Sequence, residues 1–189
     1  MKRKYLIGLF ICLISLQIAI PISMIVKRED TLKNGISFKF KVVPIDPYDA
    51  FRGRYVALRV ELTDTSYPHT MILEKEQKVF AQLSSDENGF AKISQISLKK
   101  PKDSVYLIAT VGYFTIDSGS IVHLVLPMDR YYMQENLAPR AEKLYREHNN
   151  WFSRKGDVYI TVKIKNAFVV IDGLYIGNQR IEDILKQQK

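Results

Sequence analysis

A stretch of 22 residues near the start of the chain, Tyr5 to Val26, carries no charge. As an α-helix it would be about 33 Å long at ~1.5 Å per residue. The hydrocarbon core of a bilayer is about 30 Å thick, so a helix of this length can cross it. The sequence therefore predicts a transmembrane anchor over residues 5–26.

Charges on the two sides of this stretch predict its orientation. Lys2, Arg3 and Lys4 precede it, whereas the four charges at 27–30 cancel. Short flanking segments rich in lysine and arginine remain in the cytoplasm. We therefore expect a cytoplasmic N-terminus at 1–4 and an extracytoplasmic domain at 27–189. The chain would then be a single-pass protein of the cytoplasmic (inner) membrane, with its domain in the periplasm or on the outer face.

Two other interpretations of the apolar stretch are less well supported. A cleaved signal peptide usually has an apolar region of about 7–15 residues and a small-x-small cleavage site, but the end of this stretch, residues 20–26, has no Ala-x-Ala pattern. A buried helix of a soluble protein is the other alternative. Pro21 does not exclude a membrane helix. Proline has no N–H and leaves one backbone carbonyl of the helix without its donor, but membrane helices tolerate this when another group hydrogen-bonds to that carbonyl.

Composition narrows the kinds of chemistry that the domain can carry. The net charge is +8, but the basic residues are spread along the chain, which disfavours a nucleic-acid site. Cys12 is the only cysteine, so no internal disulfide can form. The three histidines, at 69, 123 and 148, lack the spacing of metal ligands. We expect neither a metal nor another cofactor.

Alternation of apolar and polar residues predicts a mainly β domain, barrel-like or sandwich-like. The period of two is clearest at 36–43, 54–62 and 158–164. Further strands are expected at 78–83, 90–98, 105–116, 121–126 and 167–171. Turns are expected at Lys165-Asn166 and at Gly177-Asn178, and Asp172-Gly173 is a hairpin signal, after which residues 174–176 would pair back.

One helix interrupts these strands. Apolar residues recur at helical spacing between 137 and 150, where Leu137, Ala141 and Leu144 would face the sheet. A second, short helix is expected at 180–186. The expected architecture is thus one N-terminal transmembrane helix followed by a single β-rich domain with one packed helix.

The most distinctive segment, Val42–Leu58, reads VVPIDPYDAFRGRYVAL. Aspartates can cap backbone amides in a turn, and a proline fixes the turn angle. A glycine before the strand permits a positive φ. The segment is therefore first an architectural element, and its charges and its tyrosine also suit an exposed docking surface. The candidate interaction residues are Pro44, Asp46, Pro47, Asp49, Arg52, Gly53, Arg54, Tyr55 and Leu58.

This segment resembles the bacterial GDYXXLXYXX family of membrane-anchored proteins, in which a proline-aspartate loop precedes Arg-Gly-Asp-Tyr and a strand. Gly53, Tyr55 and Leu58 match the family, whereas Arg54 replaces its aspartate and Val60 its tyrosine. The resemblance extends over most of residues 36–180. It implies an envelope domain of unassigned activity with a polytopic membrane protein as partner, because such proteins are often encoded beside one.

The layout is also similar to that of type I signal peptidases, with an anchor, a proline loop and a closing Gly-Asp strand. The serine and lysine on which those enzymes depend are missing at the comparable positions, near Pro44 and near Ile108-Ala109. Nucleophilic catalysis of that kind needs both groups within hydrogen-bond reach. The resemblance implies a scaffold without this chemistry.

Three functions of different classes remain open. The first is a non-enzymatic accessory or binding subunit of a larger membrane protein assembly, which the sequence favours. The second is an extracytoplasmic sensor of a small ligand, or a spacer. The third is a hydrolase that uses carboxylates such as Asp46, Asp49 or Glu135. The sequence leaves the oligomeric state open.

Overall fold

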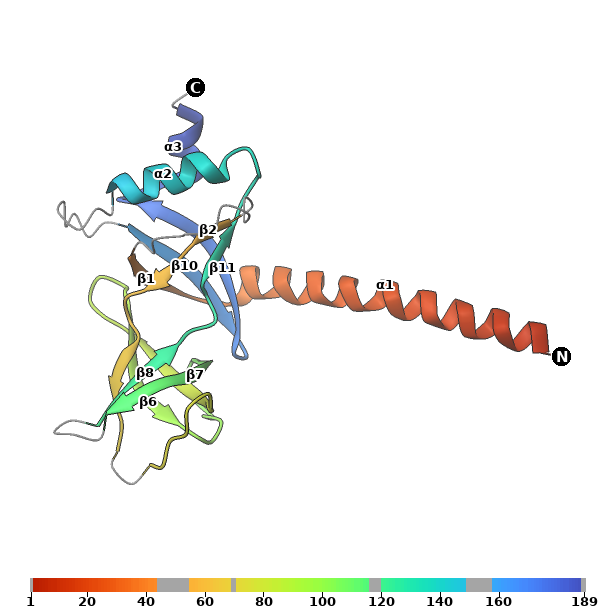
Figure 1. Ribbon diagram of the computed structural model, residues 1–189, viewed down its shortest axis with the longest axis horizontal. Helices are drawn as coiled ribbons and strands as arrows, with labels where there is room; N and C mark the ends of the chain where they lie inside the picture. Colours follow the sequence, from red (N-terminus) through yellow and green to blue (C-terminus); the bar gives the residue numbers. More distant parts are fainter. Residues whose placement is uncertain (1, 44–54, 69–70, 116–119, 149–157, 188–189) are drawn as a thin grey trace.

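The computed structural model describes residues 2–43, 55–68, 71–115, 120–148 and 158–187. A long N-terminal helix, α1 (Lys2–Asn34), leaves the side of an elongated β-rich domain (Figure 1). It is the one helix among the described residues that is long and apolar enough to cross a membrane. Pro21 lies inside α1 without ending it. The mainly β fold with an N-terminal apolar helix is therefore confirmed.

The first sheet holds the strands near the two ends of the domain sequence. Its order is β12-β11-β10-β1-β3. The strands are β1 (Ile36–Val43), β3 (Arg59–Val60), β10 (Val158–Lys165), β11 (Phe168–Ile176) and β12 (Gln179–Arg180). β1 and β10 pair antiparallel from Ile36↔Ile164 to Lys41↔Tyr159, so their alternating side chains cover the same core.

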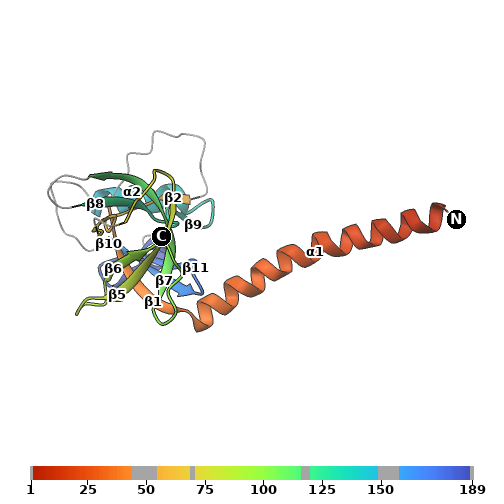
Figure 2. The same ribbon diagram turned by 90° about the horizontal axis from the view of Figure 1, so that it is seen from below.

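The second sheet holds the middle of the chain, in the order β4-β8-β7-β5-β6. Its strands are β4 (Asp64–Ser66), β5 (Lys78–Ser85), β6 (Ala91–Ser97), β7 (Tyr106–Thr115) and β8 (Ile121–Val125). The chain crosses between the sheets from β3 to β4, and isolated bridges join Lys39 to Phe90 and Leu107 to Ala167. The two sheets therefore approach a closed barrel around one apolar core, and Figure 2 shows them from below.

The expected strand at 54–62 is divided in two. β2 (Tyr55–Ala57) pairs with β9 (Arg130–Tyr132), whereas β3 pairs with β1. Between them, the Leu58 N–H donates to the carbonyl of Asp129 at 2.8 Å. The chain therefore changes partners at Leu58, which lies in the core with 2% of its surface exposed.

The expected hairpin at Asp172-Gly173 is wrong. β11 continues through both residues, and its register with β10 shifts between Thr161↔Gly173 and Val162↔Ile171. Asp172 is thus the extra residue of a β-bulge, a local irregularity that bends a strand without reversing it. The strand can continue because residues on both sides of the bulge pair with β10. The expected turn at Gly177-Asn178 is confirmed, whereas the turn expected at Lys165-Asn166 lies one residue later, at Asn166-Ala167, because Lys165 still pairs with Phe168.

Two helices close the end of the domain opposite β7 and β8 (Figure 1). α2 (Ala138–His148) buries Ala138, Ala141, Leu144 and Tyr145, so the expected packing of its apolar face is confirmed. The hydroxyl of Tyr145 donates to the carbonyl of Val43 at 2.6 Å, which fixes α2 to the end of β1. α3 (Ile181–Gln187) follows β12 and buries Ile181 and Leu185.

The packing of α2 predicts the effect of removing its central leucine. Leu144 is 6% exposed, and Leu→Ala substitutions in a core typically cost about 2–5 kcal/mol. Leu144→Ala should lower the free energy of unfolding by this amount, measured by denaturant unfolding of the detergent-solubilised chain. Lys143→Ala is the matched control, because the Lys143 side chain is 80% exposed. Equal stability of the two variants would show that α2 is not packed on the domain.

Candidate interaction site

The last two turns of α1 are docked on the domain. Thr31 is 1% exposed, and the Lys165 ammonium lies 2.7 Å from the Asp30 carboxylate. The Lys27 ammonium lies 4.4 Å from the ring centre of Phe168. Both partners flank the β10–β11 turn, so one hairpin holds the end of the helix. The hydrogen bond from Lys165 lowers the pKa of Asp30, which keeps this ion pair charged at neutral pH.

Gly35 permits the tight passage from α1 into β1. Its N–H donates to the carbonyl of Thr31 at 2.8 Å. A Cβ atom at this position would lie 2.4 Å from the same carbonyl oxygen and 3.2 Å from the backbone nitrogen of Ile164. Only glycine fits so close an approach. Gly35 therefore lets α1 pass into β1 within one residue, packed against β10.

Of the nine candidate interaction residues, the structure describes Tyr55 and Leu58. The other seven, from Pro44 to Arg54, lie outside the described residues. Leu58 belongs to the core, so its role is structural. Tyr55 is half-buried in β2, with its ring centre 5.8 Å from that of Tyr132 and 5.3 Å from the Arg130 guanidinium. The motif strand therefore joins an aromatic and cationic cluster on β9.

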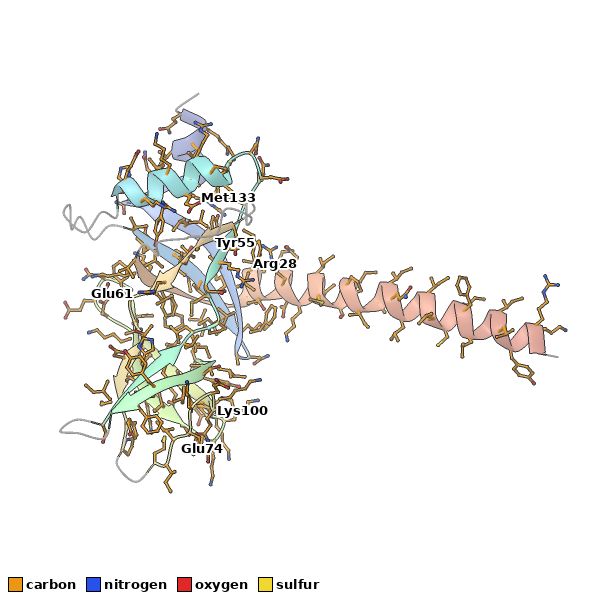
Figure 3. All side chains as sticks on the ribbon, viewed as in Figure 1. Arg28, Tyr55, Glu61, Glu74, Lys100 and Met133 are labelled. Atoms are coloured by element: carbon orange, nitrogen blue, oxygen red, sulfur yellow. The ribbon has the colours of Figure 1, made fainter. Side chains whose placement is uncertain are left out.

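A cleft of about 610 Å³ lies beside this cluster and beside the end of α1. Its walls come from α1, from β9 and the segment that leads to α2, from the start of β11, and from β12 and α3. Figure 3 shows three labelled residues on this side of the domain, namely Arg28, Tyr55 and Met133. The residues that line the cleft include Arg28, Arg130, Tyr131, Tyr132, Met133, Leu137, Phe168, Arg180 and Glu182.

A polar network forms one wall of the cleft. The Tyr131 hydroxyl donates to Glu182 Oε1 at 2.5 Å, and Arg180 Nε donates to Glu182 Oε2 at 3.1 Å. Arg180 also donates to the carbonyl of Asp172 at 2.6 Å. The bulge in β11 therefore supplies a backbone acceptor to the arginine, and the network ties β9, β11 and α3 together.

Burial and the neighbouring carboxylate change the pKa of the Tyr131 hydroxyl. Burial, and then the hydrogen bond to Glu182, raises the pKa of Tyr131 to about 12. The hydrogen bond with Tyr131 raises the pKa of Arg180, so the guanidinium remains charged. At neutral pH the Tyr131 hydroxyl therefore keeps the proton that it donates to Glu182.

The described part of the chain has few other groups that could bind a metal ion or transfer a proton. No group of three histidine, cysteine, aspartate or glutamate side chains there could hold a metal ion. His123 pairs with Asp64 at 2.7 Å and stacks on Tyr113, far along the second sheet. The Nδ1–H of His148 donates to the Leu144 carbonyl at 2.9 Å within α2.

Sequence reasoning did not place Arg130, Arg180 or Glu182 in the site. β9 has three residues, too few for a periodic pattern, and Arg180 was expected only as the start of a short helix. Adjacent tyrosines at 131 and 132 were the available signal, because an aromatic pair outside a predicted strand suggests packing or binding.

Comparison with protein families matches residues 17–174 to the GDYXXLXY protein family. The chain belongs to the GDYXXLXY family. The match covers the end of the anchor, the motif, the cleft-lining strand β9 and most of β11. Comparison with curated proteins and with solved structures found no match.

The network predicts that the Tyr131 hydroxyl makes a pH-dependent contribution to the stability of this GDYXXLXY protein. Tyr131→Phe removes a hydrogen bond to a charged acceptor and should cost about 1.5–3 kcal/mol of unfolding free energy near neutral pH. The tyrosine pKa is about 10 in an unfolded chain and about 12 here. The stabilisation is thus complete below about pH 10 and is lost as the pH rises from about 10 to about 12.

Denaturant unfolding of the wild type and of Tyr131→Phe between pH 7 and pH 12 measures this difference. Tyr132→Phe is the control, because Tyr132 is 66% exposed and should change stability by less than about 0.5 kcal/mol. A difference between wild type and Tyr131→Phe that stayed constant up to pH 12 would contradict the buried hydrogen bond.

Proposed function

We propose that this GDYXXLXY protein is a single-pass membrane-anchored binding subunit that acts without catalysis. Its domain lies outside the cytoplasm and presents the cleft to a polytopic membrane protein in the same bilayer. The motif segment at 44–58 contributes to this surface, and its described residue Tyr55 contacts Tyr132 and Arg130 of β9. No cofactor or metal takes part in this proposal.

The observation that carries the proposal is the continuity of α1 into the domain. Eight helical residues, Lys27–Asn34, separate the uncharged span from β1, a distance of about 12 Å at ~1.5 Å per residue. Headgroups occupy about 5–8 Å on each side of the hydrocarbon core. A cleft that includes Arg28 is therefore held beside the membrane surface, where the extramembrane parts of another membrane protein lie.

The surface composition of the cleft supports a protein partner. Tyrosine, methionine and arginine are enriched at the centres of protein interfaces, and the cleft combines Tyr132, Met133, Arg28 and Arg130 with the apolar Phe168. Its Tyr131–Glu182–Arg180 wall is already hydrogen-bonded. A partner would thus meet a preorganised surface, which lowers the entropic cost of binding.

Sensing of a small ligand is the second candidate. Its supporting observation is the size of the cleft, because pockets for small molecules typically measure about 300–1,000 Å³. A ligand bound only to the folded chain would raise the thermal midpoint of the purified protein, and above its Kd the stabilisation would grow with the logarithm of the ligand concentration. A protein partner would instead be retained during purification.

Affinity purification from detergent-solubilised membranes tests the binding function. We expect a polytopic protein to copurify with the wild type, and Tyr132→Ala to reduce its recovery strongly. Truncation of an aromatic side chain at the centre of an interface costs about 2 kcal/mol or more, roughly 30-fold in affinity.

Tyr113→Ala is the matched control. Tyr113 is 62% exposed against 66% for Tyr132, and each ring contacts another aromatic ring. Tyr113 lies on β7 of the second sheet, away from the cleft. Partner recovery that fell equally in both variants would remove the cleft from the proposal. The absence of any stoichiometric partner would favour the sensor.

A further inference from the structure

The loop between β6 and β7 carries a dense group of exposed cations. Lys99, Lys100 and Lys102 lie within four residues, next to Leu98, which is 44% exposed. None of the ion pairs among the described residues involves these three lysines. The loop therefore presents an excess of positive charge, three lysines against the one carboxylate of Asp103, beside an exposed apolar side chain.

Its position in the fold distinguishes this loop from an ordinary solvated surface. Lys100 and Lys102 line a shallow depression together with Asn34, the last residue of α1, and Lys165, which holds α1 by its ion pair with Asp30. The bridge between Leu107 and Ala167 fixes the start of β7 to the β10–β11 turn. The basic loop is thus attached to the same hairpin that holds the anchor.

Figure 3 shows the direction in which this loop faces. In Figure 3, Lys100 and Arg28 lie on the side of the domain from which α1 leaves, and Glu61 lies on the opposite side. If residues 5–26 cross the bilayer, the side with Lys100 faces the membrane. The helix extends only about 12 Å beyond the span before the domain begins, so extended lysine side chains on this side come close to the headgroups.

We propose that the Leu98–Lys102 loop binds the anionic phospholipid headgroups of the membrane that α1 spans. The chemistry is complementary, because the three ammonium groups outnumber the single carboxylate of Asp103 and would meet phosphate groups, while Leu98 would reach the boundary of the acyl region. Clusters of basic residues beside a transmembrane helix are attracted to anionic lipids. With α1, the loop forms a second attachment point that holds the long axis of the domain along the membrane. This lipid contact needs no protein partner.

Electron paramagnetic resonance of the full chain in nanodiscs tests the proposal. The sole cysteine is first removed by Cys12→Ser, and a nitroxide is attached through Leu98→Cys. Discs contain phosphatidylcholine alone, or phosphatidylcholine with 30% phosphatidylglycerol, and each carries a trace of a nickel-chelating lipid. Power saturation then reports how often the nitroxide collides with the headgroup layer.

We expect collisions to be at least twofold more frequent in the anionic discs. Each lysine near an anionic surface contributes about fivefold to the contact equilibrium. The increase should disappear in Lys99→Glu/Lys100→Glu/Lys102→Glu, and in 1 M salt, where the Debye length is only about 3 Å. All three substitutions are at exposed positions, so circular dichroism should show an unchanged fold.

The matched control carries the nitroxide at Glu87→Cys, in the turn between β5 and β6. This residue is exposed, and both ribbon views place the turn away from α1 (Figures 1 and 2). Its collision frequency should be the same in the two kinds of disc. Equal collisions at Leu98→Cys in both discs would overturn the proposal, as would an equal increase at Glu87→Cys or in the triple glutamate variant.

Discussion

The docking of α1 on the β10–β11 hairpin determines what the rest of this structure can do. A transmembrane helix joined to a domain by a flexible linker fixes only the distance of that domain from the membrane. Here the ion pair between Asp30 and Lys165, the buried Thr31 and the close approach at Gly35 join helix and sheet without a linker. The orientation of the domain relative to the helix is therefore fixed as well.

The same hairpin also builds the candidate interaction site. Phe168 lies under Lys27 and lines the cleft, and the bulge at Asp172 offers its carbonyl to Arg180. Arg180 in turn donates a hydrogen bond to Glu182, and Glu182 accepts a second hydrogen bond from the hydroxyl of Tyr131 on β9. The contacts of α1 and the wall of the cleft thus share strand β11.

Strong periodic patterns in the sequence were sufficient to predict most of the strands and helix α2. The alternation in β1 and β10, and the apolar face of α2, each continue for eight residues or more. β4 and β9 have three residues each, and so short a strand has no measurable period. At Asp172-Gly173 the local turn preference was overridden, because the flanking residues gain more by continuing the ladder with β10.

The candidate site was less predictable because it depends on contacts between distant residues. Asp30 and Lys165 are 135 positions apart, and Tyr131 and Glu182 are 51 apart. Neither pair belongs to a motif with regular spacing. The family resemblance drew attention to the segment before Tyr55, whereas the described cleft is lined by β9, with which Tyr55 pairs, together with parts of α1, β11, β12 and α3. A pairing of this kind follows from topology and not from local sequence.

The central claim is that α1 and the domain move as one body in the bilayer. Double electron–electron resonance between nitroxides on the native Cys12, within the span, and on Glu87→Cys, across the domain, measures it in nanodiscs. We expect a single narrow distance distribution, which the double substitution Asp30→Ala/Lys165→Ala should broaden. A distribution that is already broad with the Asp30–Lys165 ion pair intact would contradict this claim, because the helix would then be hinged where it meets the sheet.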